Sequence, residues 1–257
     1  MIKSKEHIKN FDTIFEDVKF TANSLVRLKV LAALFDKPQN IKTISDKTGI
    51  GYSSVSSTIH DLELKNWVYR ERNKYYLTTS TRVRIENVLE LDQTLVIINE
   101  FFNILDGHLV DMIPNESVLE LYLLGKAYLM ESQGVDVYRI YKFIENSLSD
   151  SESVKCIMPI YYDPFFEVLN NLISENKDVE IYVPQNLLAI FEEKSGIKTL
   201  KPFDEIDSFL LIITDKSMIL GFFMDNGFFD QNRVLTSKNK DSLIWANNLF
   251  ENFKKGL

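Results

Sequence analysis

The sequence predicts two domains of different class, a small α+β domain followed by a larger α/β domain. Two observations support this prediction. Up to about residue 80, four stretches with helical spacing precede two short aromatic stretches typical of a β-hairpin. From Pro114 onward, strand-like and helical segments alternate. A chain of 257 residues with 45% hydrophobic side chains can supply a core to each domain.

The N-terminal domain is expected to begin with an amphipathic helix over residues 5–20, where apolar side chains recur at helical spacing. A second helix is expected over residues 25–35, with Ser24 as its N-cap. A shorter helix over 41–48 follows, and the glycines in 49–51 then permit a tight turn. These spacings predict three helices before residue 52.

The helix expected over residues 52–65 has two contrasting faces. Its apolar stripe consists of Val55, Ile59 and Leu62, which recur at i, i+4 and i+7. The opposite side carries small polar residues, namely Ser53, Ser57 and His60. Such a helix can bury one face while the other meets a polar partner.

Two β-prone segments, 67–70 and 75–77, follow this helix and are separated by the basic tip 71–74. The last three of these helices, followed by a basic hairpin, are in the order of a winged helix-turn-helix. The predicted fold class is therefore an α+β winged helix-turn-helix N-terminal domain plus an α/β C-terminal sensor domain.

A long helix over 81–105 is expected to connect the domains or to pair with a symmetry mate. The predicted boundaries are residues 1–85 for the winged domain, 86–112 for the linker or dimerisation helix, and 113–257 for the α/β domain. Strands are expected in the latter at 118–124, 154–158, 179–183, 209–214 and 218–224, and helices at 137–148, 164–176, 186–194 and 240–254.

Charge is distributed unevenly between these parts. Residues 21–85 hold 11 Lys and Arg against 5 Asp and Glu, whereas residues 86–257 hold 14 against 28. The total of −8 therefore hides a basic N-terminal module and an acidic remainder. Only the first is expected to meet the phosphates of double-stranded DNA.

A DNA major groove, about 12 Å wide, admits one α-helix, and the helix over 52–65 suits that position. Its outward residues would face the bases: Ser53, Ser57 and His60. Other residues would contact phosphate: Lys42, Tyr52, Ser54 and Ser56. The hairpin would reach the DNA backbone or minor groove through Arg70, Arg72 and Lys74. Because this helix lacks arginine, affinity should come mainly from phosphates, and specificity should be modest or dependent on DNA shape.

The stretch 42–78 is similar to the archaeal winged-helix regulators of the MarR, ArsR and TrmB type, in which a helix ending in Thr-Gly precedes a Ser-rich recognition helix. Asn66 stands where many relatives have glycine, and asparagine also tolerates a left-handed helix stop. The stretch 217–256 looks like the effector domain of methanogen regulators of the FilR type. Its matching residues are Asp225 and Gly227 in a turn, then Ser237, Asp241, Trp245, Leu249 and Phe250. Both resemblances imply transcription regulation.

An enzymatic function is not expected. The FilR-type domain is thought to resemble half of a phospholipase D-like fold, whose chemistry requires an HxKxxxxD pattern, and no histidine here begins one. The GxSxG, GxxxxGK[ST], GxGxxG and HExxH patterns are also missing. With one cysteine and three histidines far apart in sequence, no metal centre or other cofactor is expected.

A small-molecule effector site is the hypothesis for the segment after the strand at 154–158. Tyr161, Tyr162 and Asp163 would line it together with Arg233. The alternative is that both tyrosines simply pack beneath the loop. Cys156, inside an apolar strand, is interpreted as an inert core residue rather than a redox sensor.

A homodimer is expected from the apolar faces of 8–18 and 91–102, although packing within one chain would explain them almost as well. The sequence has neither a membrane-spanning apolar run nor an N-terminal signal, so a cytoplasmic protein is expected. The rival interpretation of function is a winged-helix protein-interaction module that acts on the transcription machinery without specific DNA binding.

Overall fold

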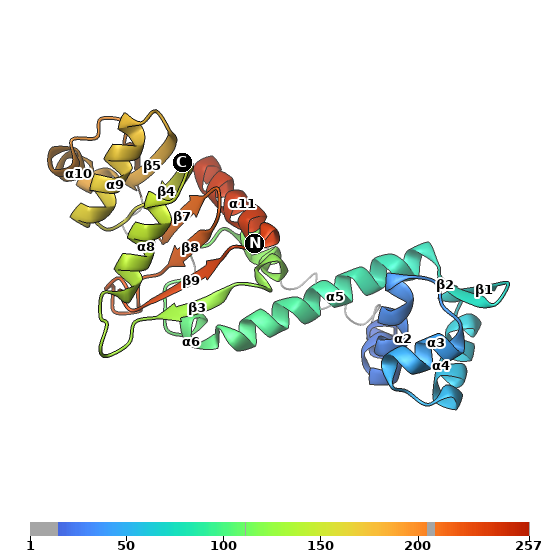
Figure 1. Cartoon of the computed structure of the whole chain (residues 1–257). Helices are drawn as coiled ribbons and strands as arrows, with labels where there is room; N and C mark the ends of the chain where they lie inside the picture. The colour runs from blue at the N-terminus through green and yellow to red at the C-terminus, as the bar shows by residue number, and fades with distance from the viewer. Residues whose placement is uncertain (1–14, 111, 205–208, 257) are drawn as a thin grey trace. The chain divides into compact units, whose positions relative to one another are not determined.

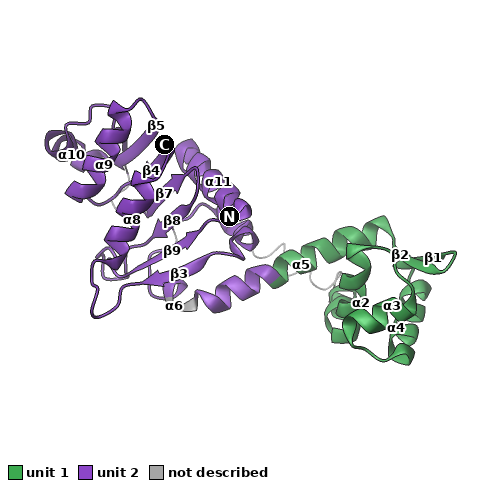
Figure 2. Cartoon of the chain, viewed as in Figure 1, with its two compact units in different colours: residues 1–92 green, residues 93–257 purple. Residues whose placement is uncertain are grey.

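The computed structural model describes residues 15–110, 112–204 and 209–256 (Figure 1). The chain divides into two compact units, residues 1–92 and 93–257 (Figure 2). Of the helix expected over residues 5–20, the part up to residue 14 lies outside the described residues, and residues 15–22 are helical.

The first unit is rich in helix. Its elements are α2 (Leu25–Asp36), α3 (Ile41–Thr48), α4 (Tyr52–Leu64), β1 (Val68–Glu71), β2 (Lys74–Leu77) and the first part of α5 (Thr79–Glu100). One apolar core joins these elements, with Leu31 from α2, Ile44 from α3 and Val55 and Leu62 from α4 all fully buried. Burial of these side chains holds the three short helices and the hairpin together.

Local capping sets the ends of these helices as the sequence predicted. The Ser24 hydroxyl accepts a hydrogen bond from the backbone N–H of Arg27 at 3.2 Å, which confirms Ser24 as the N-cap of α2. Gly49 ends α3 with a φ of 70°, and Asn66 follows α4 with a φ of 56°. Both residues adopt the left-handed conformation that stops a helix.

The hairpin is slightly longer than expected. Val68 pairs with Leu77 and Glu71 pairs with Lys74, so Glu71 and Lys74 belong to the strands and only residues 72–73 form the turn. Arg72 has a φ of 54°, in the left-handed region. The same basic side chains remain at the tip.

Helix α5 runs through the boundary between the units, and α6 (Phe102–Leu105) follows it. The sequence predicted one helix over residues 81–105, but the helical pattern is interrupted at Phe101. Phe101 and Ile97 are both buried in the core of the C-terminal unit. The interruption of the helix therefore lies where these side chains pack into that core.

The C-terminal unit contains a seven-stranded mixed sheet in the order β3-β9-β8-β7-β4-β5-β6. Its strands are β3 (Tyr128–Glu131), β4 (Ser153–Ile157), β5 (Asp178–Pro184), β6 (Lys201–Phe203), β7 (Leu210–Thr214), β8 (Met218–Gly221) and β9 (Arg233–Ser237). Strands β4, β5 and β6 are parallel, and the other neighbours are antiparallel.

Helices cover both faces of this sheet. The helical elements are α7 (Asn115–Leu119), η1 (Leu121–Leu124), α8 (Arg139–Ser149), α9 (Asp163–Ser174), η2 (Gln185–Leu187), α10 (Leu188–Ser195) and α11 (Lys240–Gly256). One core lies beneath α8, α9 and α10, and the other lies beneath α11 (Figure 1). Side chains alternate between the two cores along each central strand: Leu210 and Ile212 enter the first, and Leu211 and Ile213 enter the second.

Two strand predictions are wrong in this unit. Residues 118–124, expected as a strand, form the end of α7 and η1, because Pro114 precedes a helical turn whose Ser117 carbonyl accepts a hydrogen bond from Trp245 Nε1 at 2.9 Å. Strand β8 ends at Gly221 rather than at residue 224, since the chain beyond it pairs with residues 108–109 instead.

The strands β3, β6 and β9 were not predicted, whereas β4, β5 and β7 agree with the prediction within one residue at each end. Cys156 lies on β4, is fully buried, and has a pKa raised by burial. Its assignment to the core is thereby confirmed. None of the described helices is both long and apolar enough to cross a membrane.

Candidate nucleic-acid interface and sensor region

Helix α4 has the two faces that its sequence spacing predicted. Val55, Ile59 and Leu62 are buried in the core. The proposed contact residues Tyr52, Ser53, Ser54, Ser57 and His60 are exposed, and Ser56 is half-buried. The structure thus presents a polar, hydrogen-bonding surface on one side of a helix fixed by its apolar side.

The N-terminus of α4 adds a favourable field for anions. Gly51 occupies the N-cap and supplies no side-chain hydrogen bond to the first turn of this 13-residue helix. The first backbone N–H groups therefore point outward with the positive end of the helix dipole. Tyr52, Ser53 and Ser54 stand in this turn and are exposed. This end of α4 is suited to contact a phosphate.

Exposed cations lie on α3 and on the hairpin, both of which contact α4. Lys42 on α3 and the hairpin residues Arg70, Arg72 and Lys74 are exposed. Within the described parts of the chain, no carboxylate lies within salt-bridge distance of any of these four.

Other cations of the same unit are already engaged. Lys47 pairs with Asp36, and Arg84 pairs with Asp17 at 2.9 Å. The guanidinium of Arg82 lies 4.5 Å from the centre of the Phe35 ring. Some cations of this unit are therefore occupied by contacts within the chain. The cations without a carboxylate partner among the described residues include those predicted to contact DNA.

The sensor residues Tyr161, Tyr162 and Asp163 lie between β4 and α9, which begins at Asp163. Tyr161 stacks on Phe166 with 4.7 Å between ring centroids and lies edge-on to Phe191. Burial, together with a hydrogen bond to Asp163, raises the pKa of Tyr161 to about 12. Both tyrosines are half-buried, so their rings pack into the core while part of each remains accessible.

Tyr162 has its own aromatic partners, since its ring centroid lies 4.6 Å from that of Tyr141. Arg233 stands on β9, which is separated from β4 by β8 and β7. Its Nε donates to Asp230 Oδ2 at 2.7 Å. The structure therefore brings the first three predicted sensor residues together on one segment, and it places Arg233 against Asp230.

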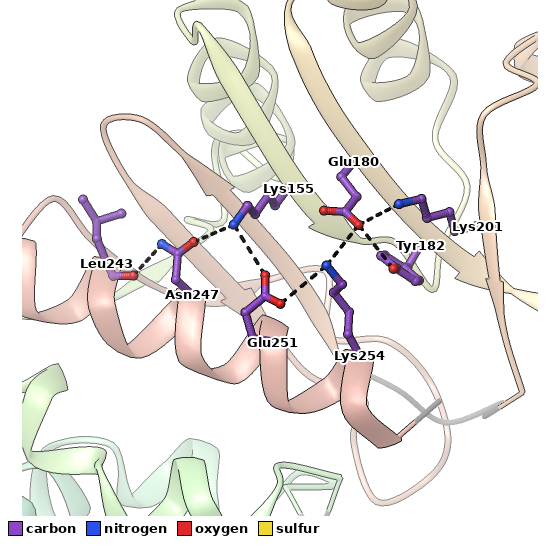
Figure 3. Close-up of polar contacts among 8 residues, drawn as sticks. All are labelled: Lys155, Glu180, Tyr182, Lys201, Leu243, Asn247, Glu251 and Lys254. Atoms are coloured by element: carbon purple, nitrogen blue, oxygen red, sulfur yellow. Dashed lines mark hydrogen bonds and ion pairs between the residues drawn. The ribbon is translucent and has the colours of Figure 1, made fainter.

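Two polar clusters were not found from the sequence. The first joins α11 to the sheet (Figure 3): Glu180 Oε1 accepts hydrogen bonds from Lys201 Nζ at 2.8 Å and Tyr182 OH at 3.2 Å and lies 3.3 Å from Lys254 Nζ. Burial acts to raise the pKa of Glu180, but the two ammonium groups hold it below its usual value. Glu251 extends the cluster to Lys155 at 3.6 Å. The parallel register of β4, β5 and β6, which sequence alone does not give, brings these strand residues together.

The second cluster is His108, Asp230 and Arg233. His108 Nε2 lies 2.9 Å from Asp230 Oδ2, and the side chains of both residues are almost completely buried. His108 and Asp230 are 122 positions apart, so no local pattern could have linked them.

Two hollows accompany these features. In the N-terminal unit, a mostly apolar groove of about 540 Å³ lies among residues 15–22, α2 and α5, with Val18, Leu28 and Leu91 in its walls. In the C-terminal unit, a polar pocket of about 340 Å³ is lined by Lys155, Asn247 and other residues of β4, β7 and α11. The first is the larger and more apolar of the two.

Two protein-family models match the chain. Residues 137–256 match the middle domain of the methanogenesis regulatory protein FilR1, and residues 15–98 match the HVO_A0261 N-terminal domain. No curated relative matches the chain.

Similar solved structures have low sequence identity. TrmBL2, described as an archaeal chromatin protein with a novel mode of DNA binding, is 9% identical with a TM-score of 0.40, over 99% of this chain and 98% of that one. A Rhodococcus sp. protein described as an IclR-family transcriptional regulator is 12% identical with a TM-score of 0.23, over 92% of each chain. CalO1, a methyltransferase of calicheamicin biosynthesis, is 10% identical with a TM-score of 0.22, over 77% of this chain and 66% of that one. At such TM-scores these likenesses carry no argument.

The two family matches cover the stretches on which the sequence resemblance was based. The FilR1 match contains the whole stretch 217–256 on which a FilR-type domain was expected. The other match covers α2, α3, α4 and the hairpin. The expected resemblance is confirmed: residues 137–256 are similar to the middle domain of a methanogenesis regulatory protein, FilR1.

Proposed function

We propose that this protein is a DNA-binding transcription regulator, in which the N-terminal unit acts as a winged helix-turn-helix and the C-terminal α/β domain senses a signal. The observation that carries this proposal is the surface of α4. Its apolar face is buried, its outer face is polar and exposed, and the nearby exposed cations Lys42, Arg70, Arg72 and Lys74 have no carboxylate partner among the described residues.

In this proposal α4 enters the major groove and the β1–β2 hairpin is the wing. Ser53, Ser57 and His60 face the base edges, where hydroxyl and imidazole groups donate and accept hydrogen bonds. Tyr52, Ser54, Ser56 and Lys42 hold phosphates, and Arg70, Arg72 and Lys74 contact the backbone or minor groove. Without an arginine on α4, discrimination between bases is expected to be modest.

A homodimer forms part of the proposal, because two recognition helices would then meet a two-fold DNA site. The support is the apolar groove among residues 15–22, α2 and α5. Large apolar side chains are also exposed on α2 and α5, namely those of Leu25, Val83, Leu91 and Leu95. A second copy would cover these side chains. The proposed domain boundaries remain 1–85, 86–112 and 113–257.

The effector site proposed for the sensor domain consists of Tyr161, Tyr162, Asp163 and Arg233. The partial exposure of the two tyrosines and the exposure of Asp163 support it. Their ring contacts with Phe166 and Tyr141 support the alternative that both tyrosines only pack the loop. Substituting both tyrosines by phenylalanine distinguishes the two, since only an effector site loses its hydroxyl contacts.

The second candidate function is a protein-interaction module that uses the winged domain on the transcription machinery. The observation that favours it is the absence of arginine from α4. It predicts weak DNA binding that does not depend on Arg70, Arg72 or Lys74.

Fluorescence anisotropy tests the proposal with the full chain on its own promoter fragment and on random duplex, from about 50 to 200 mM salt. Preference for the promoter, with a roughly 10³- to 10⁵-fold loss of affinity over this range, is the result expected for six to ten phosphate contacts. Lys198→Ala, an exposed change in the C-terminal unit, is the matched charge control. Equal and weak binding to both duplexes, unaffected by changes in the hairpin, would support the interaction module instead.

A further inference from the structure

His108 lies where the connecting helices end and meet the sheet. Helix α6 ends at Leu105, and the backbone of His108 forms a β-bridge with Met224. The next residue, Leu109, donates its N–H to the carbonyl of Phe223 at 2.8 Å. All of these residues belong to the C-terminal unit. The His108 side chain is 1% exposed, so its ring is part of this junction rather than of the surface.

Both ring nitrogens of His108 face oxygen atoms. Nδ1 lies 2.9 Å from the carbonyl oxygen of Ile104, and Nε2 lies 2.9 Å from Asp230 Oδ2. A backbone carbonyl can accept a hydrogen bond but cannot donate one, so Nδ1 must carry a proton. The state of Nε2 therefore depends on whether Asp230 is ionised.

The contacts of Asp230 require the carboxylate. Its Oδ2 accepts from Arg233 Nε at 2.7 Å as well as from His108, and its Oδ1 accepts from the backbone N–H of Asn232 at 2.9 Å. Burial acts to raise the pKa of Asp230, but these donors hold it below its usual value. Since both oxygens already accept hydrogen bonds, the proton between the two side chains belongs to Nε2. His108 is then an imidazolium that donates in two directions.

We propose that His108 is a proton-operated catch that holds the end of α6 on the connection between β8 and β9. As an imidazolium, it bonds Ile104 and Asp230 at once. When one proton leaves, Nε2 keeps its own, because the hydrogen bond to a carboxylate is the stronger of the two. The Nδ1 lone pair then faces the lone pairs of the Ile104 carbonyl, and the catch opens on the side of the helix.

Charged side chains lie near the ring on the elements packed around it. Asp230 Oδ2 faces Nε2 and also accepts a hydrogen bond from Arg233 Nε. Glu131 is the register partner of Arg233 across β3 and β9. Asp106 and Asp225 lie on or beside the two paired segments and add negative charge. The remaining ring neighbour, Phe222, is uncharged.

The position of the catch gives it a regulatory use. The chain enters α6 from α5, and α5 is the helix shared by the two units. Any signal that changes the protonation of His108, or that draws Arg233 away from Asp230, changes how firmly this helical end is held. The catch therefore assigns Arg233 a role in the junction in addition to any contact with an effector.

Nitrogen-15 NMR of the full chain with labelled histidine tests the proposal. While the catch is closed, both His108 ring nitrogens should be protonated, and once raised pH has removed one proton the ring should be the tautomer that is protonated at Nε2. Amide exchange at Leu105 and Leu109 should then rise roughly tenfold beyond its intrinsic pH dependence, as expected for one lost buried hydrogen bond. His60→Gln, a change at an exposed position on α4, is the control and should leave exchange at these amides unchanged.

A neutral His108 ring while exchange at Leu105 stays slow, or exchange that does not follow the protonation state of the ring, would overturn the proposal. Asp230→Asn should speed amide exchange at Leu105, because the carboxylate that faces Nε2 is lost, whereas Asp225→Asn, a matched change at an exposed position, should leave it unchanged. Equal changes in exchange in the two variants would show a general field effect instead of a catch. If Asp230→Asn fails to fold, the protonation state and tautomer of the His108 ring in the unaltered protein still test the proposal.

Discussion

Neutralising the hairpin should reduce the salt dependence of DNA binding by a defined amount. Arg72 and Lys74 are exposed, and no carboxylate in the described structure pairs with them. Arg72→Asn suits the left-handed φ of 54° at this position, because asparagine tolerates that conformation. Lys74→Gln keeps a polar, flexible side chain, one atom shorter than that of lysine, at the same place in β2. The double variant thus removes two charges with little expected change to the hairpin.

The magnitude follows from counterion release. Each phosphate contact contributes about 0.9 to the slope of log affinity against log salt, so two lost contacts lower that slope by about 1.8. Over a fourfold increase in salt, the loss of affinity should shrink by about 12-fold relative to the unaltered protein. Because phosphate contacts carry no sequence information, binding to promoter and to random duplex should weaken by similar factors.

Anisotropy titrations at four or more salt concentrations measure this slope, with Lys198→Ala as the control for a lost charge elsewhere. Thermal unfolding of the double variant checks that the hairpin still folds. An unchanged slope would refute the assignment of this hairpin as a DNA-contacting wing.

Other predictions concern stability and reactivity. Ser24→Ala should lower the free energy of unfolding by about 1 kcal/mol, because the hydroxyl caps α2, and urea unfolding of the variant measures the loss. Leu249→Ala, at a fully buried position on α11, should cost about 2 to 5 kcal/mol in the same assay, and a smaller cost would show that the core there is loosely packed. The pKa of Glu180 is lowered in the folded chain, so its contribution to stability is present above its ordinary pKa of 4.5 and is lost as the pH falls through the folded value. Glu180→Gln should flatten the acidic side of the stability profile, and an unchanged profile would contradict the role of Lys201 and Lys254. The Cys156 thiol should react with a disulfide reagent only after unfolding, because it is buried and its pKa is raised, and fast reaction of the folded protein would show that β4 opens.

The first unit could be predicted closely because its signals are local. The Ser24 cap, the left-handed Gly49 and Asn66, and the apolar spacing on α4 each act within a few residues. The exposed polar face of α4 follows directly from that spacing, since burying one face leaves the other outside. The exposure of most of the proposed contact residues could therefore be predicted without knowledge of the fold.

The second unit was predicted less completely because its decisive contacts are distant in sequence. Residues 118–124 are apolar enough for a strand, but the hydrogen bond from Trp245 to Ser117 and packing on α11 accompany helical turns there. Strand β3 is an edge strand whose only ladder partner among the described strands is β9. The catch at His108 depends on a residue 122 positions away, and no periodicity reports such a contact.

Hydrogen exchange of the full chain with and without its promoter duplex tests the central proposal most directly, because it reports which backbone segments meet DNA. The account predicts slower exchange in residues 52–60 and 70–74 on binding, reduced protection there at higher salt, and no change in α9. Protection confined to the C-terminal unit, or none in α4 at a duplex concentration that saturates the anisotropy signal, would contradict the proposal that α4 is the recognition helix.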